Sequence, residues 1–573
     1  MAPSRIAIAL VALTLTAQSA WSGPLTPLRA GQAGRLQPLA AADVDAIVQL
    51  VKLEDTRRFD ETVLAQVLKS PHPEVRRRAV VSIGRIVGSS PVGPDLQVAA
   101  LHSRGRALLA GMRGESDPDI LATVAFATGQ LKDPDAVNWL DDQLSGPKRP
   151  PSVAFEAARA LGKIRTPEAR AALAKYLGTA PATRAAEAAV GEALLSIGRF
   201  PPPGDLPPIL RWTTSPSVEV RWRAAWALVR PRDPAAVTEL LRMTGDKAPE
   251  VRFWAVRGLV ATVVDQAKLD RAVTSARLRA ALRDPDRRVR TEALRALAGY
   301  DDDESFAVLL AALDSPDTWL SVSAAEAMGR FTSRKDLVVP KLVAAVAPAK
   351  PLALRLTALT PLAALAPDAA KAPASALAAD ASVVAKGVAT QTLARLEGPP
   401  PPRQGGPRPP RTPPAAQTDD EYRRIVERWV VPDYNGAPKP RVVLETPRGA
   451  IEIELYAGDA PLGLDYLVKM VESGEIVGTE FSRVVPNFVD QQRAIRGEGT
   501  LRDEVNRRGL TRGNLSWASA GLDTGRPGYT LNHTPQPHNE GDFTSLGRVV
   551  RGMDAVDRIE LGDKITGARM LTR

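Results

Sequence analysis

The sequence predicts a multidomain protein in which an all-α solenoid, a proline-rich spacer and a smaller domain with β-strands follow one another. Three observations support this division. A Pro-containing opening recurs from Pro216 to Pro351 at intervals of 33, 36, 31 and 35 residues, which is the period of a helical-hairpin repeat. A run of prolines lies near residue 400, and beyond residue 440 apolar and polar residues alternate as in a half-buried strand. The predicted ranges are 38–396 for the solenoid, 397–417 for the spacer and 418–573 for the last domain.

Residues 1–22 have the composition of a signal peptide. A short positive region ends at Arg5, an apolar stretch runs from Ile6 to Thr16, and small residues at 17–19 or 20–22 offer a cleavage site. The apolar stretch is shorter than the ~20 residues of a membrane span, and no later run approaches that length. We therefore expect export, most simply to a bacterial periplasm, and no membrane span after the signal is removed; the alternative is an uncleaved anchor.

The solenoid is predicted from a motif in which a proline precedes Val-Arg and an Ala/Leu-rich helical pattern. In one copy we expect Asp284 to cap a helix and Pro285 to lie in its first turn. Four residues of that helix should share one buried face: Val289, Ala293, Leu294 and Leu297. The clearest copies of the motif end at Arg76, Arg221, Arg252 and Arg290.

These openings with their Ala-rich second halves resemble HEAT repeats, about nine or ten hairpins in all. Hairpins of this kind stack into a curved solenoid, which usually binds partners through its concave surface. Four large aromatic residues gather in adjacent repeats, and they are either exposed contacts for a partner or part of the core between repeats: Trp222, Trp226, Phe253 and Trp254.

Composition excludes several classes of function. The net charge is +10 and the pI is about 9.8, but the charge is spread along the chain without a nucleic-acid-binding motif, so we expect no nucleic-acid partner. The chain contains no cysteine, which leaves no thiol for lipid attachment, disulfides or redox chemistry. Of its four histidines only His533 and His538 lie close together in sequence, and no further ligand follows at metal-site spacing. We expect no metal and no cofactor.

The spacer at 397–417 is rich in proline, which predicts an extended, semi-rigid connection that lets the two parts move relative to each other. A helix should begin at Thr418, because Glu421 follows it at the spacing of a capping box. We expect this helix to dock on the last domain through Tyr422, Ile425, Val426 and Trp429.

The last domain begins with a predicted hairpin. Ile451, Ile453 and Leu455 alternate with glutamates, and Pro447-Arg448-Gly449 separates two apolar runs with turn-forming residues. A helix should open at Ala460-Pro461, because proline is accepted in a first helical turn and apolar residues then recur at helical spacing.

Three later segments resemble signatures of the cyclophilin-type peptidyl-prolyl cis-trans isomerases. Phe481–Gln491 is similar to F-H-R-V-I-P-x-F-M-I-Q, Arg512–Gly521 to R-G-x-L-S-M-A-N-A-G, and Leu546–Asp557 to F-G-x-V-x-x-G-M-x-V-V. With the two segments before them they span residues 441–559 in the family's order. The resemblance implies a closed antiparallel β-barrel with flanking helices, and an enzyme that rotates X-Pro amides of proline-containing polypeptide clients.

The resemblance also implies the site. Arg483 is the guanidinium that stabilises the twisted amide, Phe488 receives the proline ring, and Gln491 holds the arginine and the substrate. Val489 supplies apolar wall and Ala518 contacts the substrate backbone.

The departures from the family lie in one stretch. Gly528 replaces a glutamine and Thr530 replaces a pocket phenylalanine, while His538 and Phe543 fall at the positions of a tryptophan and a histidine. Tyr529 could turn its ring into the pocket as a substitute. Two interpretations follow: an exported isomerase whose repeats recruit clients or dock on an envelope complex, or an interaction scaffold whose barrel binds peptides with little or no turnover.

Overall fold

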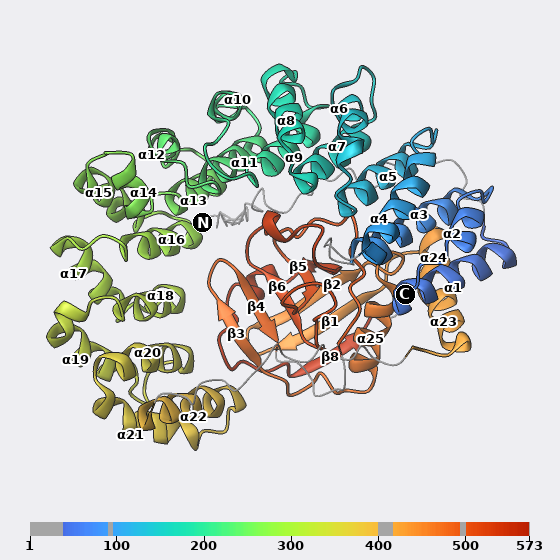
Figure 1. Ribbon diagram of the computed structural model, residues 1–573. Helices are drawn as coiled ribbons and strands as arrows, with labels where there is room; N and C mark the ends of the chain where they lie inside the picture. Colours follow the sequence, from blue (N-terminus) through green and yellow to red (C-terminus); the bar gives the residue numbers. More distant parts are fainter. Residues whose placement is uncertain (1–37, 90–95, 399–415, 493–499, 572–573) are drawn as a thin grey trace, which may run out of the picture.

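The computed structural model describes residues 38–89, 96–398, 416–492 and 500–571. The predicted signal segment and most of the predicted spacer lie outside these residues. Figure 1 shows the helices as an arc that surrounds a curled β-sheet. Among the helices of the described ranges, none combines the length and apolar composition needed to cross a membrane.

The arc runs from α1 (Ala41–Thr56) to α22 (Val383–Glu397), and one row of helices along it faces the sheet (Figure 1). Neighbours in this row pack directly on one another, which is the stacking expected of a helical-hairpin repeat. Between α1 and α22 the row contains α3 (Pro73–Gly88), α5 (Pro118–Gln130), α7 (Pro151–Ile164), α9 (Glu187–Ile197), α11 (Val218–Val229), α13 (Pro249–Arg257), α16 (Arg287–Leu297), α18 (Thr318–Met328) and α20 (Leu352–Leu365). The intervening helices are α2 (Glu61–Val67), α4 (Leu96–Gly111), α6 (Val137–Ser145), α8 (Pro167–Thr179), α10 (Leu206–Leu210), α12 (Val237–Met243), α14 (Ala261–Gln266), α15 (Arg271–Ala281), α17 (Asp303–Ala312), α19 (Lys335–Ala345) and α21 (Pro367–Ala378).

The arginine of the Val-Arg motif ties each hairpin to the next. Arg221 donates to the carbonyl oxygens of Ser215 (2.8 Å) and Pro216 (3.2 Å), which precede its own helix. It also makes a bidentate ion pair with the Asp246 carboxylate of the following hairpin, at 2.9 Å. Because such a fork has one favoured geometry, it sets how adjacent hairpins stack. Arg252 repeats this arrangement with a bidentate pair to Asp284. Arg76 and Arg290 keep the two carbonyl contacts and make a single hydrogen bond to the next carboxylate, Glu115 and Asp317 respectively.

The expected cap of α16 is wrong by two residues. The carboxylate of Asp286 accepts the backbone N–H of the first turn (2.8 Å), and Pro285 lies before the helix. Asp284 is instead the partner of Arg252 in the link just described. The buried face is as predicted: Val289, Ala293, Leu294 and Leu297 are all at most 1% exposed.

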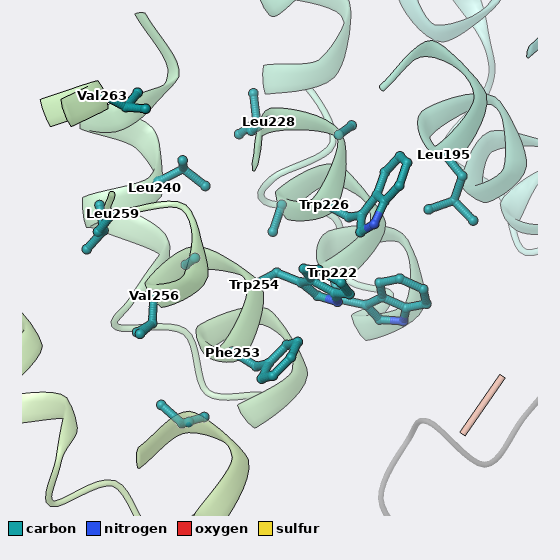
Figure 2. Packing of buried hydrophobic residues seen from close by; sticks show 14 of the residues in the cluster. Leu195, Trp222, Trp226, Leu228, Leu240, Phe253, Trp254, Val256, Leu259 and Val263 are labelled. Carbon is teal, nitrogen blue, oxygen red and sulfur yellow. The ribbon is translucent and has the colours of Figure 1, made fainter. Parts of the chain in front are cut away.

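The aromatic cluster is core between repeats. Trp222, Trp226, Phe253 and Trp254 are between 0% and 4% exposed, and Figure 2 shows these residues of α11 and α13 among aliphatic side chains of the same and neighbouring helices. The rings of Trp222 and Trp254 stack with centroids 6.5 Å apart. Of the two interpretations of these residues, the structure supports the packing one.

The last domain is built on an antiparallel sheet of eight strands in the order β3-β4-β6-β5-β7-β2-β1-β8. The sheet curls, and a bridge between Glu480 and Lys564 joins the β3 side to the segment that leads into β8. The hairpin turn at Pro447-Arg448 and the helix start at Pro461 are as predicted. The strands are β1 (Arg441–Thr446), β2 (Gly449–Leu455), β3 (Phe481–Val485), β4 (Val489–Gln492), β5 (Asn514–Trp517), β6 (Tyr529–Asn532), β7 (Ser545–Arg551) and β8 (Gly567–Met570), with helices α25 (Pro461–Glu472) and α26 (Met553–Val556) beside them.

The helix that begins at Thr418 joins both parts of the chain. Its capping box forms, because Thr418 and Glu421 exchange side-chain and backbone hydrogen bonds. The four predicted docking residues are all buried, at most 4% exposed. The Tyr422 hydroxyl donates to Asp55 of α1 (2.6 Å), whereas the Trp429 indole donates to Asp465 of α25 (3.0 Å). The segment consists of α23 (Asp419–Ile425), a π-helical turn (Val426–Val430) and α24 (Val431–Tyr434).

The structure contradicts the expectation that the two parts move independently. The first helices of the arc share one apolar core with the sheet. Buried ion pairs lie at the same interface: Glu54 binds Arg78 (2.7 Å) and Arg85 (2.6 Å), and these arginines donate to the barrel carbonyl oxygens of Gly458 (3.1 Å) and Val505 (3.0 Å). The composition of a connecting segment does not predict whether the parts that it joins pack against each other. Here they do, through the shared core and these ion pairs.

Candidate functional site

Four side chains form a row across the strands at one end of the sheet. Arg483 on β3 is opposite Gln491 on β4, Gln491 is opposite Thr530 on β6, and Thr530 is opposite Ser516 on β5. Because residues opposite each other in a sheet point to the same face, these four share a face. Val489, two residues before Gln491 on the same strand, also points to this face.

Arg483 and Phe488 form the centre of the site. The Arg483 guanidinium carbon lies 5.3 Å from the centroid of the Phe488 ring. The Arg483 side chain is exposed, and among the described residues no carboxylate forms an ion pair with it. Phe488 also stacks on His538, with centroids 6.4 Å apart and the ring planes at 18°. A cation without an ion-pair partner among the described residues, an apolar ring and an imidazole are therefore contiguous.

The remaining predicted site residues differ in where their side chains lie. Ala518 follows β5, is half-buried, and donates its backbone N–H to the Gly528 carbonyl oxygen (2.8 Å). Phe543 is half-buried in the loop before β7. Tyr529 does not lie in the pocket: neighbouring strand residues face opposite sides, so its ring points away from Thr530 and is wholly buried in the domain core. The expected substitution of a pocket ring by Tyr529 is therefore wrong.

The solenoid holds the turn that carries Phe488. The Asn487 amide donates to the Arg288 carbonyl oxygen and to the Glu292 carboxylate, each at 2.9 Å. Arg295 of α16 donates to the Pro486 carbonyl oxygen at 2.6 Å. Because Asn487 is only 1% exposed and has a positive φ of 63°, these contacts secure an unusual backbone turn.

The solenoid also holds the loop that carries His538 and Phe543. Arg199, after α9, donates to the Pro537 carbonyl oxygen at 2.8 Å. Lys163 of α7 pairs with Asp542 at 2.6 Å. Sequence reasoning missed these contacts, because each joins residues more than 190 positions apart and neither side carries a motif for it.

The charge state of His538 follows from its surroundings. Partial enclosure between the two parts of the chain, and then the charges of Arg230, Arg257 and Arg199, lower the pKa of His538 to about 4. The His538 side chain remains exposed to solvent. A neutral imidazole near pH 7 extends the apolar wall that begins at Phe488.

A buried aspartate–histidine pair lies behind the site. Asp490 and His533 are both 0% exposed, with Oδ1 and Nε2 2.9 Å apart, and Trp319 of α18 stacks on the imidazole at 4.8 Å. Burial raises the pKa of Asp490 to about 6. Within the described ranges no group of three His, Asp or Glu side chains could hold a metal ion.

Comparison with known proteins assigns both parts. Residues 441–572 match the family described as cyclophilin type peptidyl-prolyl cis-trans isomerase/CLD. Residues 105–192, 191–260 and 275–360 match HEAT repeats.

Similar single proteins cover the last domain. A peptidyl-prolyl cis-trans isomerase of Synechococcus elongatus is 31% identical over 140 residues, which is 23% of this chain and 97% of that protein. Peptidyl-prolyl cis-trans isomerase B of Bacillus subtilis is 34% identical over 128 residues, 21% of this chain and 90% of that protein. A solved cyclophilin type isomerase of Cryptosporidium parvum is 18% identical with a TM-score of 0.22, covering 24% of this chain and 99% of that one.

Proposed function

Because the chain belongs to the cyclophilin-type peptidyl-prolyl cis-trans isomerases and carries HEAT repeats before that domain, we propose that it isomerises X-Pro bonds of exported protein clients. The site is the group formed by Arg483, Phe488 and Gln491. The observation that supports it best is the exposed Arg483 guanidinium, which lies beside the Phe488 ring and has no ion-pair partner among the described residues.

The reaction needs no nucleophile. Rotation of an X-Pro amide is slow because resonance gives the C–N bond double-bond character, with a barrier of ~18–20 kcal/mol. Twisting localises a lone pair on the prolyl nitrogen, and Arg483 can donate to it. Since this interaction exists only in the twisted form, it lowers the barrier and does not merely tighten binding. Phe488 and Val489 supply an apolar surface for the proline ring.

In this proposal the repeats support the isomerase domain of their own chain and also meet other proteins. Their concave side is turned to the chain's own barrel, where α7, α9 and α16 contact the loops that carry Phe488 and His538. Clients or an envelope partner would meet the outer side of the arc or the mouth of the site. Export rests on the composition of residues 1–22, which lie outside the described residues. Absence of the chain from periplasmic extracts would contradict export, and a periplasmic chain that still begins at Met1 would contradict cleavage of residues 1–22.

The test is an isomerase assay on the full chain with a short X-Pro peptide, read by exchange NMR so that no protease is present. We expect acceleration that depends on protein concentration. A rate equal to the uncatalysed one, with peptide binding retained, would leave a peptide-binding scaffold as the function.

A further inference from the structure

A cavity of about 200 Å³ lies between the solenoid and the barrel, next to the proposed proline site. Its solenoid walls come from α11 to α14 and include Trp226, Trp254 and several aliphatic side chains. Its barrel wall contains Gln536 and His538. Because His538 stacks on Phe488, the cavity adjoins the surface proposed for the proline ring.

Arginines converge on this cavity. Arg230, Arg232 and Arg257 line it. Partial burial, and then the charges of Arg165, Arg232, Arg199 and Arg257, lower the pKa of Arg230, so all five lie within electrostatic reach. They lie at or shortly after the C-terminal ends of α7, α9, α11 and α13, where a helix dipole favours cations. The helix dipole explains why a cation is found at each of these ends, but it does not explain why Arg230 and Arg257 lack an ion-pair partner among the described residues.

Two of these arginines lack a carboxylate partner within the part of the chain that the structure describes. Among the described residues neither Arg230 nor Arg257 has an ion-pair partner, whereas Arg221 and Arg252 of the same two helices each bind a carboxylate in bidentate fashion. The one acidic residue of the lining, Asp233, accepts backbone N–H groups of Gly204 (2.7 Å) and Ala235 (2.9 Å). The positive potential of the cavity is therefore available to a ligand.

A buried donor in the lining is also unsatisfied. Trp254 is 4% exposed, and its indole nitrogen has no hydrogen-bond partner among the described residues. An indole N–H can only donate, so a ligand in the cavity that offers an acceptor atom would suit it. A carboxylate with an apolar body would suit the arginines, the indole and the aliphatic walls together.

We infer that this cavity is a second peptide subsite, built by the solenoid, that binds a carboxylate of the client near its isomerised proline. The inference rests on the proposed function for the identity of the ligand as a client, whereas the anionic chemistry rests on the cavity alone. Client specificity would then be a property of the repeats, exercised at the mouth of the barrel.

The experiment measures binding and turnover separately on the full chain. Short fluorescent peptides with one Ala-Pro carry Glu or Gln at each flanking position in turn, and a further pair ends in a free acid or an amide. We expect one Glu position, or the free acid, to bind roughly tenfold tighter than its neutral counterpart, which corresponds to about 1.4 kcal/mol. Discrimination by a Glu/Gln pair assigns the carboxylate to a side chain, and discrimination by the acid/amide pair assigns it to the peptide terminus.

Variants locate the effect. Arg230→Glu and Arg257→Glu should each abolish the preference while leaving binding of the Gln peptide unchanged, which also shows that the variants fold. Arg184→Glu is the matched control, because this exposed arginine precedes α9, at the opposite end from Arg199, and should keep the preference. Equal binding of all acidic and neutral peptides would overturn the inference, as would a preference that survives both cavity variants. Competition by inorganic phosphate without discrimination between peptides would also overturn it. Charge-selective binding without any isomerisation would refute the proposed function and leave the subsite.

Discussion

Replacing Arg483 tests the proposed chemistry most directly, because the structure separates its effect on stability from its effect on rate. The side chain is exposed and has no ion-pair partner among the described residues. Arg483→Ala should therefore change the free energy of unfolding by less than ~0.5 kcal/mol, as for an ordinary surface substitution. A hydrogen bond from a charged donor is worth about 1.5–3 kcal/mol. If Arg483 makes it only in the twisted state, kcat/KM should fall by about 10- to 100-fold, mainly through kcat.

The assay is exchange NMR on the full chain, with thermal unfolding of each variant measured alongside. Arg483→Lys should be intermediate, because an ammonium keeps the charge but loses the planar donors. Arg551→Ala is a control for removing an exposed arginine from the same sheet, since the Arg551 side chain is 81% exposed. An Arg483→Ala protein that is folded and as fast as wild type would refute the reasoning.

Four further predictions follow from the contacts around the site. Arg295→Ala removes the donor to the Pro486 carbonyl oxygen and should lower kcat/KM by roughly 5- to 10-fold, the effect of about 1 kcal/mol of lost positioning; rates unchanged from wild type would show that the turn needs no support. Thr530→Phe adds an aromatic ring to the pocket face beside Gln491 and should raise affinity for X-Pro peptides in a titration, and weaker binding would contradict this. Burial raises the pKa of Glu504 to about 7, above its usual ~4.3, so its contribution to stability is present at low pH and is lost as pH rises through about 7. The melting temperature should therefore fall between about pH 4.3 and pH 7, and Glu504→Gln should reduce this fall. Parallel pH profiles of the two proteins would show that Glu504 is not the cause. Cleavage within 399–415 should leave the two parts associated in size-exclusion chromatography, because they share a buried core, and separate elution would disprove that core.

The local features of this protein could be predicted from its sequence. The repeat period, the Pro447-Arg448 turn, the cap at Thr418 and the helix start at Pro461 are as expected, because each depends on residues within a few positions of one another. The proposed site residues Arg483, Phe488 and Gln491 lie on two adjacent strands and the turn between them, so a motif of eleven residues is enough to bring them close together. The error at Tyr529 has a local cause too, since adjacent strand residues face opposite sides and only one of positions 529 and 530 can face the pocket.

The placement of the barrel inside the arc was decided by tertiary structure alone. Asn487 binds α16, Arg199 binds the His538 loop, and the arginine-lined cavity exists only where solenoid and barrel meet. Each of these features joins residues about 200 or more positions apart in the sequence, on either side of a proline-rich segment. Neither hydrophobic periodicity nor a motif predicts contacts over such a separation. Periodicity determines which face of a helix is buried, whereas the shape and charge of the assembled surfaces determine what covers that face.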